Sequence, residues 1–283
     1  MKRKYTEMKL TVSECKEKIA DADMVLIGLG KELEPDFEAV LKSNDIYNRF
    51  KDDIDSMEQT EGVWLEYAIY YHELVSMNNP IINKKLELIN KLAQAVATKN
   101  IFVVSTCDLD VVRYSAFEKE RIVTPCGTIL KKECHVGCKK DVYSAVEDYE
   151  KIYKKLISMY KADEFDVMSI MNVIPICEKC EATMEPNLLK MVSYSEEGYL
   201  KKWELYNKWL SGTVNRKLVM LELGENFNTP TVIRWPFEKI ALINKKSLLI
   251  RVNKKFPMLV PEISETAVAL DMTSEEFIEE ISK

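Results

Sequence analysis

Two pairs of cysteines carry the most specific chemical signal in this sequence. Cys134 and Cys138 form a C-x3-C pair, and Cys177 and Cys180 form a C-x2-C pair. Each spacing lets two thiolates point at one ion from a tight turn, and two such turns complete a tetrahedral Zn²⁺ site. The alternative is four unrelated buried thiols, which two close pairs in one segment disfavour. Because four protein ligands leave no open position, we expect this zinc to be structural.

A glycine loop is the second chemical signal. Gly28 and Gly30 follow the apolar run 24–27. A Rossmann fold cradles diphosphate at such a turn, because glycine lets backbone N–H groups approach the phosphate. The same pattern is also found in simple tight turns, so the loop alone leaves both interpretations open. Lys31 would neutralise a phosphate, whereas Glu32 would repel one if it faced it.

The elements that position these residues alternate between strands and helices. Helical patterns, such as the one over 83–98, precede or separate the strand-like runs. Alternation of this kind predicts an α/β fold, a Rossmann-like doubly wound parallel sheet. The apolar runs typical of strands buried on both faces are 24–28, 101–105, 218–224 and 247–252.

Two segments interrupt the alternation. Residues 31–82 carry no strong strand pattern and indicate a helical insert. Residues 126–195 hold the clustered cysteines and an amphipathic helix over roughly 139–161, and we interpret them as an inserted small zinc-binding module. Residues 1–125 and 196–283 would then form the Rossmann-like domain.

Composition excludes several classes of function. The chain has 283 residues, 47% of them apolar, and a net charge of −6, which argues against an electrostatic grip on nucleic acid. No apolar run approaches the length that spans a membrane, and the basic start MKRK lacks the apolar segment of a signal peptide. We therefore expect a cytoplasmic protein, in which the seven cysteines stay reduced.

Taken together, several segments resemble the sirtuin family, and most of all its macrodomain-linked (class M) members. Class M similarity is carried by 133–138, 223–230 and 233–237, and the whole resemblance runs from about residue 10 to 260. The other matching segments are Gly28-Leu29-Gly30, Pro35-Asp36-Phe37, Thr106-Cys107-Asp108-Leu109-Asp110, Cys126-Gly127 and Met184-Glu185-Pro186-Asn187.

This resemblance implies NAD binding between the Rossmann core and the small module, with cleavage of the nicotinamide–ribose bond. Most sirtuins transfer an acyl group from lysine to ADP-ribose. Class M members look like protein ADP-ribosyltransferases, which implies a lipoylated carrier protein or a macrodomain protein as partner. The positions that match cofactor-binding residues of the family are Gly28, Gly30, Asp36, Phe37, Asp108, Asp110, Gly224 and Asn253.

The chain departs from the family at residues on which the chemistry depends. Glu32 and Glu38 replace a serine and an arginine, and Asp108 stands where the family has asparagine. Cys126 occupies the position of the catalytic histidine, and the two histidines of the chain, His72 and His135, lie elsewhere. Because deacylation needs a base near neutral pKa, these replacements disfavour ordinary deacetylation.

Asp108 and Cys126 are the candidate catalytic residues. Asp108 could hold a carboxamide and stabilise a developing cation, or it could simply cap its turn. Cys126 could act as a nucleophile if its pKa were lowered, or it could fill the space of a lost catalyst. Asp110 is expected to bond backbone amides of its own turn.

We interpret the chain as a divergent, NAD-dependent protein ADP-ribosyltransferase of sirtuin type. The alternative is a catalytically silent module that binds NAD, ADP-ribose or a protein. A third hypothesis is that the cofactor pocket has closed and the protein is purely an interaction partner. It rests on Glu32 and Glu38, two carboxylates near the expected diphosphate that would oppose an anionic ligand.

Overall fold

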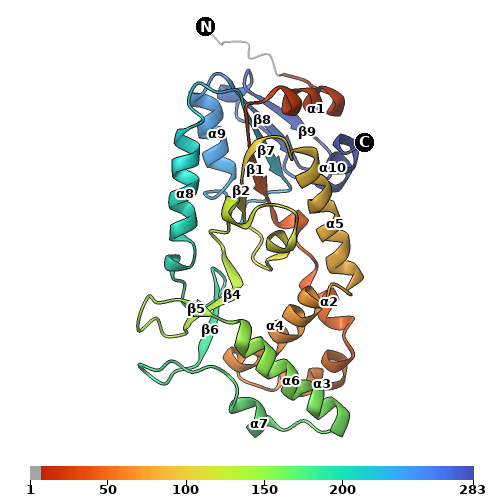
Figure 1. The fold of residues 1–283 in the computed structure, drawn as a ribbon, viewed down its shortest axis with the longest axis vertical. Helices are drawn as coiled ribbons and strands as arrows, with labels where there is room; N and C mark the ends of the chain where they lie inside the picture. The colour runs from red at the N-terminus through yellow and green to blue at the C-terminus, as the bar shows by residue number, and fades with distance from the viewer. Residues whose placement is uncertain (1–7) are drawn as a thin grey trace.

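The computed structural model describes residues 8–283, so the basic start of the chain lies outside it. Its core is a six-stranded parallel sheet in the order β3-β2-β1-β7-β8-β9 (Figure 1). In chain order this is the 3-2-1-4-5-6 arrangement of a Rossmann fold, which confirms the predicted doubly wound sheet. The strands are β1 Met24–Leu29, β2 Asn100–Ser105, β3 Ile122–Val123, β7 Leu218–Leu223, β8 Ser247–Val252 and β9 Ala267–Leu270.

Side chains of β1 alternate between two cores, as the period of a strand requires. Val25 and Ile27 belong to the core under α1 (Val12–Asp21), α5 (Pro80–Ala95) and α10 (Ser274–Ile281). Leu26 belongs to the core under α8 (Leu200–Ser211) and α9 (Arg234–Ile243). Since both faces of the sheet are covered, its central strands are mostly apolar, and the buried Glu222 of β7 and Arg251 of β8 pair with each other at 2.7 Å.

The insert over 31–82 is helical, as expected. It contains the 3₁₀ turn η1 (Lys31–Leu33), followed by α2 (Phe37–Lys42), α3 (Asp45–Asp55) and α4 (Gln59–Ser76). Trp64 on α4 is fully buried, and its Nε1 donates a hydrogen bond to the Met184 carbonyl, 2.7 Å away. The insert therefore packs directly against the cysteine module, in the lower half of Figure 1.

The cysteine module contains a small antiparallel sheet that the sequence did not indicate. Its strands, in the order β5-β4-β6, are β4 Gly127–Cys134, β5 Tyr143–Ser144 and β6 Met184–Leu188. The helix predicted over 139–161 begins only at Val146 (α6, Val146–Ala162), because residues 143–144 pair with β4 first. A short helix, α7 (Val167–Met171), follows.

The remaining elements are short 3₁₀ turns: η2 Val111–Tyr114, η3 Lys119–Arg121, η4 Glu196–Gly198 and η5 Pro261–Ile263. Within residues 8–283, no helix is both long enough and apolar enough to cross a membrane.

Candidate functional site

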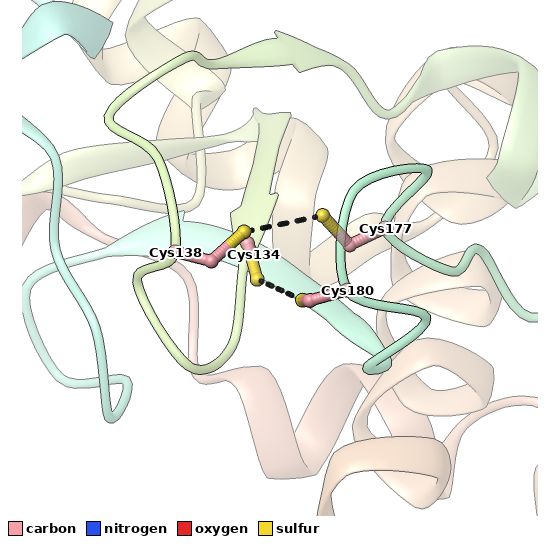
Figure 2. Close-up of side chains that lie close together, drawn as sticks. All are labelled: Cys134, Cys138, Cys177 and Cys180. Atoms are coloured by element: carbon pink, nitrogen blue, oxygen red, sulfur yellow. Dashed lines mark hydrogen bonds between the residues drawn. The ribbon is translucent and has the colours of Figure 1, made fainter.

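The four cysteines come together, as their spacing predicts. Figure 2 shows their side chains converging from two loops, one at the end of β4 and one between α7 and β6. All four Sγ atoms lie within 4.8 Å of one another, and the Cys134–Cys180 and Cys138–Cys177 sulfurs are 3.5 Å apart. A tetrahedral zinc with bonds of about 2.3 Å would place its sulfurs about 3.8 Å apart. The cluster therefore fits a structural zinc ion.

Backbone geometry prepares these thiols for a metal. Gly137 has φ of +62°, which the tight turn between Cys134 and Cys138 requires. In the second loop, the backbone N–H groups of Lys179 and Cys180 lower the pKa of Cys177 to about 6. Thiolate is the form that binds zinc, so the backbone around Cys177 favours the ligating state of that thiol.

The second group of candidate residues lies at the carboxyl ends of β1, β2 and β7. β1 lies between the other two, so the strand order reverses direction there. Ligands of doubly wound sheets bind at this switch point. Gly30, Thr106 and Gly224 directly follow the three strands.

Asp108 is buried at this end of the sheet and lies between two ammonium groups. Its Oδ1 is 3.1 Å from Lys31 Nζ and its Oδ2 is 3.6 Å from Lys190 Nζ. Glu34 Oε1 accepts hydrogen bonds from the backbone N–H groups of Asp108 (2.6 Å) and Leu109 (2.9 Å). Asp108 therefore belongs to a compact ionic cluster in which Lys31 also pairs with Glu34 at 2.7 Å.

The charges in this cluster are strongly coupled. Burial alone would lower the pKa of Lys31, but the carboxylates of Asp108 and Glu34 outweigh it and raise that pKa. Burial, together with the charge of Asp108, raises the pKa of Glu34, and Lys31 offsets part of this rise. Lys31 is therefore a permanent cation beside Asp108.

Asp110 binds a different partner from the one expected. Its Oδ2 accepts hydrogen bonds from Thr128 Oγ1 (2.6 Å) and the Ile129 backbone N–H (2.9 Å), and its Oδ1 is 2.7 Å from Arg113 Nε. Thr128 and Ile129 lie on β4, so the expectation that Asp110 bonds backbone amides of its own turn is wrong; within that turn it pairs with the Arg113 side chain. The carboxylate instead ties the end of β2 to the cysteine module.

Each of the three predicted glycines lies where a side chain would collide with a neighbour. A Cβ on Gly30 would lie 2.3 Å from the Gly224 carbonyl oxygen. Gly224 itself has φ of +64°. A Cβ on Gly28 would lie 2.6 Å from Ile233, the residue before α9, so packing explains this glycine. Their cofactor-binding roles stay predictions.

Asn253 also reaches the switch point. Its Nδ2 donates to the Glu225 carbonyl at 2.5 Å, and its Oδ1 accepts from the N–H groups of Lys255 and Phe256. It thereby joins the loops that follow β7 and β8.

Asp36 and Phe37 lie at the start of α2. Asp36 Oδ1 accepts from the Ala39 N–H at 3.0 Å and caps the helix, and the Phe37 ring packs 5.0 Å from that of Tyr67. A cavity of about 530 Å³, lined by Lys31, Glu34, Asp36, Lys84 and Lys85 among others, lies beside them. Asp36 and the ionic cluster therefore share one cavity wall.

Cys126 is not an activated thiol in this structure. It is 4% exposed, and its Sγ lies 3.8 Å from Thr229 Oγ1. Burial raises its pKa to about 11, although the Thr229 hydrogen bond and the charge of Lys31 act against this rise. At neutral pH the thiol is therefore protonated.

Glu225 is a candidate residue that sequence reasoning missed. Its side chain is fully buried, with Oε2 accepting from Thr106 Oγ1 at 2.8 Å. Within the described residues, Oε1 has no hydrogen-bond partner. Burial raises its pKa to about 7. The sequence offered one signal for this residue: Glu225 is a charged residue directly after Gly224, where the chain leaves the buried strand β7.

The two carboxylates expected to oppose a diphosphate are engaged elsewhere. Glu32 accepts hydrogen bonds from the N–H (3.1 Å) and Oγ (2.9 Å) of Ser274 at the start of α10. A helix N-terminus stabilises a negative charge. Glu38 is exposed and pairs with Lys42 at 2.6 Å.

The chain has the fold of Sir2 proteins, the sirtuins. It is similar to a Sir2 homologue in complex with NAD, with a TM-score of 0.54 and 10% identity over 98% of this chain and 94% of that one. It is also similar to Sir2Tm bound to a propionylated peptide, with a TM-score of 0.52 and 14% identity over 96% and 97% of the two chains. The resemblance inferred from sequence is thus confirmed for the fold.

Two curated proteins are similar in sequence. A protein ADP-ribosyltransferase of Staphylococcus aureus is 22% identical over 78% of this chain and 68% of its own length. A probable bifunctional ADP-ribose hydrolase/ADP-ribosyltransferase of Fusarium oxysporum is 27% identical over 52% of this chain. The match spans only 24% of that second protein. No family model matches the chain.

Proposed function

We propose that this protein is an NAD-dependent protein ADP-ribosyltransferase that breaks the nicotinamide–ribose bond. The observation that carries the proposal is the buried Asp108, held between Lys31 and Lys190 at the switch point of a Sir2 fold. The names of the two curated relatives support the same reaction class.

The residues at the switch point fit a dinucleotide. Gly30 and Gly224 bring backbone close together without side chains, and the unpartnered Oε1 of Glu225 would accept a hydrogen bond from a ribose hydroxyl. Lys85, which lines the neighbouring cavity, would offset part of the charge of a diphosphate. When bound there, NAD would supply the ADP-ribosyl group and release nicotinamide.

Asp108 would then orient the carboxamide and stabilise positive charge that develops on the ribose. Glu34 positions Asp108 by binding two consecutive backbone N–H groups of its loop. Lys31 balances the charge of both carboxylates and keeps the cluster ordered. We assign Cys126 a packing role, because a thiol with a pKa of about 11 is a poor nucleophile.

The positions of the two histidines, His72 and His135, argue against ordinary deacetylation. His72 stacks on Tyr153, with ring centroids 3.8 Å apart. His135 Nδ1 is 2.9 Å from a carboxylate oxygen of Glu185, in the cysteine module. Each has its own partner, and neither stands at position 126, where the resemblance places the base that deacylation requires.

The proposal is tested by incubating the purified protein with labelled NAD and acceptors that include lipoylated carrier protein and macrodomain proteins. We expect nicotinamide release and label transfer to protein, with Asp108→Ala slowing release by about 100-fold or more. Asp141→Ala, at an exposed position, is the matched control. Absence of nicotinamide release under every condition would refute the proposal.

A second candidate function is a silent module that binds NAD or ADP-ribose. It is favoured by the ion pairs that already occupy both carboxylate oxygens of Asp108. Calorimetric titration separates the two functions: binding of NAD without turnover supports the module, whereas turnover that Asp108→Ala abolishes supports the enzyme.

The acceptor and the location also belong to this proposal. A protein acceptor is supported by the peptide bound to the similar Sir2Tm structure. The expected partner is a lipoylated carrier protein or a macrodomain protein. The expected location of the reaction is the cytoplasm.

A further inference from the structure

Helices α8 and α9 leave an apolar groove between them. From α8 the groove is lined by residues spaced as i, i+3, i+4 and i+7, and from α9 by residues with the same spacing. This spacing marks one face of each helix. The lining residues are Trp203, Tyr206, Asn207 and Leu210 on α8, and Pro236, Lys239, Ile240 and Ile243 on α9. The two faces enclose a cavity of about 680 Å³ instead of packing together.

The open end of this groove exposes large apolar side chains. Ile243 is 70% exposed and Val214 is 67% exposed. Both belong to the groove lining, as does Leu210. A concave apolar lining that ends in exposed aliphatic residues is typical of an interaction site.

The charge of the groove is opposite to that of the chain. The lining includes Lys239, Lys245 and Lys246 but no acidic residue, although the chain has a net charge of −6. Within residues 8–283, none of these three lysines forms an ion pair. All three are exposed. The groove therefore offers three uncompensated cations beside an apolar floor.

We propose that this groove binds an acidic amphipathic helix of a partner protein. Such a helix would lay its apolar stripe between α8 and α9 and place its carboxylates against the three lysines. The concave shape favours a helix over a membrane. A surface that binds lipid must insert its apolar residues into the bilayer, which the residues inside a groove cannot do.

The position of the groove makes this inference independent of the proposed reaction. Its turns 213–215 and 244–246 lie shortly before β7 and directly before β8, at the amino ends of these strands. The ionic cluster around Asp108 lies at the carboxyl ends. A bound helix would therefore leave the candidate reaction site open.

Fluorescence anisotropy with a labelled synthetic helix tests the proposal on the full chain. The probe carries leucine at i, i+3, i+4 and i+7 and glutamate on the other faces. Its controls are a peptide of the same composition without the stripe and one with lysine in place of glutamate. Vesicles of phosphatidylserine serve as the lipid probe.

Two variants and a matched control complete the test. The triple variant Lys239→Glu, Lys245→Glu and Lys246→Glu is expected to weaken binding about ten-fold or more, as is Ile243→Asp. The control triple variant Lys154→Glu, Lys155→Glu and Lys161→Glu reverses three exposed charges on α6. It should bind like the unaltered protein.

The proposal is supported if the acidic striped peptide binds, if binding weakens with salt, and if only the groove variants lose it. It is overturned if the peptide does not bind at millimolar concentration or binds equally well to the groove variants. Binding to the vesicles in place of the peptide also overturns it. Thermal unfolding of each variant shows that a lost signal does not come from a lost fold.

Discussion

Replacing Glu225 with glutamine is expected to remove a pH-dependent loss of stability. The folded protein raises the pKa of Glu225 from 4.5 to about 7, chiefly through burial. Between these two values the folded state binds more protons than the unfolded state, so stability falls as pH rises. The destabilisation is absent below the unfolded value and complete above the folded one.

The magnitude follows from the difference between these two pKa values. At about 1.4 kcal/mol per pH unit, a difference of 2.5 (7 − 4.5) corresponds to about 3 kcal/mol. Because the carboxyl is fully buried, little of this is lost to solvent screening. Glu225→Gln keeps the shape and the hydrogen bond from Thr106 but cannot ionise. It should therefore gain up to about 3 kcal/mol over the unaltered protein between pH 5.5 and pH 8.

Urea unfolding of both proteins at a series of pH values measures this gain. Other groups that titrate in the same range, such as Glu34, cancel in the difference between the proteins. Glu197→Gln, at an exposed position, is the control and should show no pH-dependent difference. If the stability difference between Glu225→Gln and the unaltered protein is the same at pH 5.5 and pH 8, the burial argument is wrong.

The remaining predictions concern the metal, the thiol and the glycine loop. The protein should bind about one zinc ion, and Cys177→Ser or chelation should cost about 3 kcal/mol or more, measured by metal analysis and urea unfolding. Because its pKa is about 11, Cys126 should react with iodoacetamide at pH 7.5 at least about 100-fold more slowly than an exposed thiol, followed by mass spectrometry. Gly30→Ala should destabilise the protein by about 3 kcal/mol or more, because its Cβ would lie 2.3 Å from the Gly224 oxygen. Gly212→Ala, whose Cβ would lie 3.2 Å from the nearest atom, should cost much less in the same unfolding assay.

Local sequence patterns were sufficient to predict many of the strands. β1, β2, β7 and β8 were predictable because each is mostly an apolar run, although β7 contains the buried Glu222 and β8 the buried Arg251. β3 and β9 were not, because two and four residues are too few to show a period. β4 and β6 were missed because neither is a long apolar run: residues 131–133 of β4 are all charged, and residues 185–187 of β6 are Glu, Pro and Asn.

The two candidate sites differed in how far sequence could define them. The zinc ligands were predictable because each pair is held by one short turn, so spacing alone constrains the geometry. The cluster at the switch point was only partly predictable, since Asp108 was recognised by the resemblance, which places it where the family has asparagine. Its partner Lys190 comes from a loop far along the chain, and no local pattern links the two.

By itself, the sequence determined the alternation of strands and helices, the four cysteine ligands and the resemblance at the strand ends. Only the tertiary structure decided that Glu32 turns to Ser274, that Asp110 bonds β4 and that Glu225 is buried with one oxygen unpartnered. The physical reason is the range of the interactions. Turn geometry and apolar period depend on neighbours in the chain, whereas burial, ion pairing and pKa depend on groups that meet only when the sheet has formed.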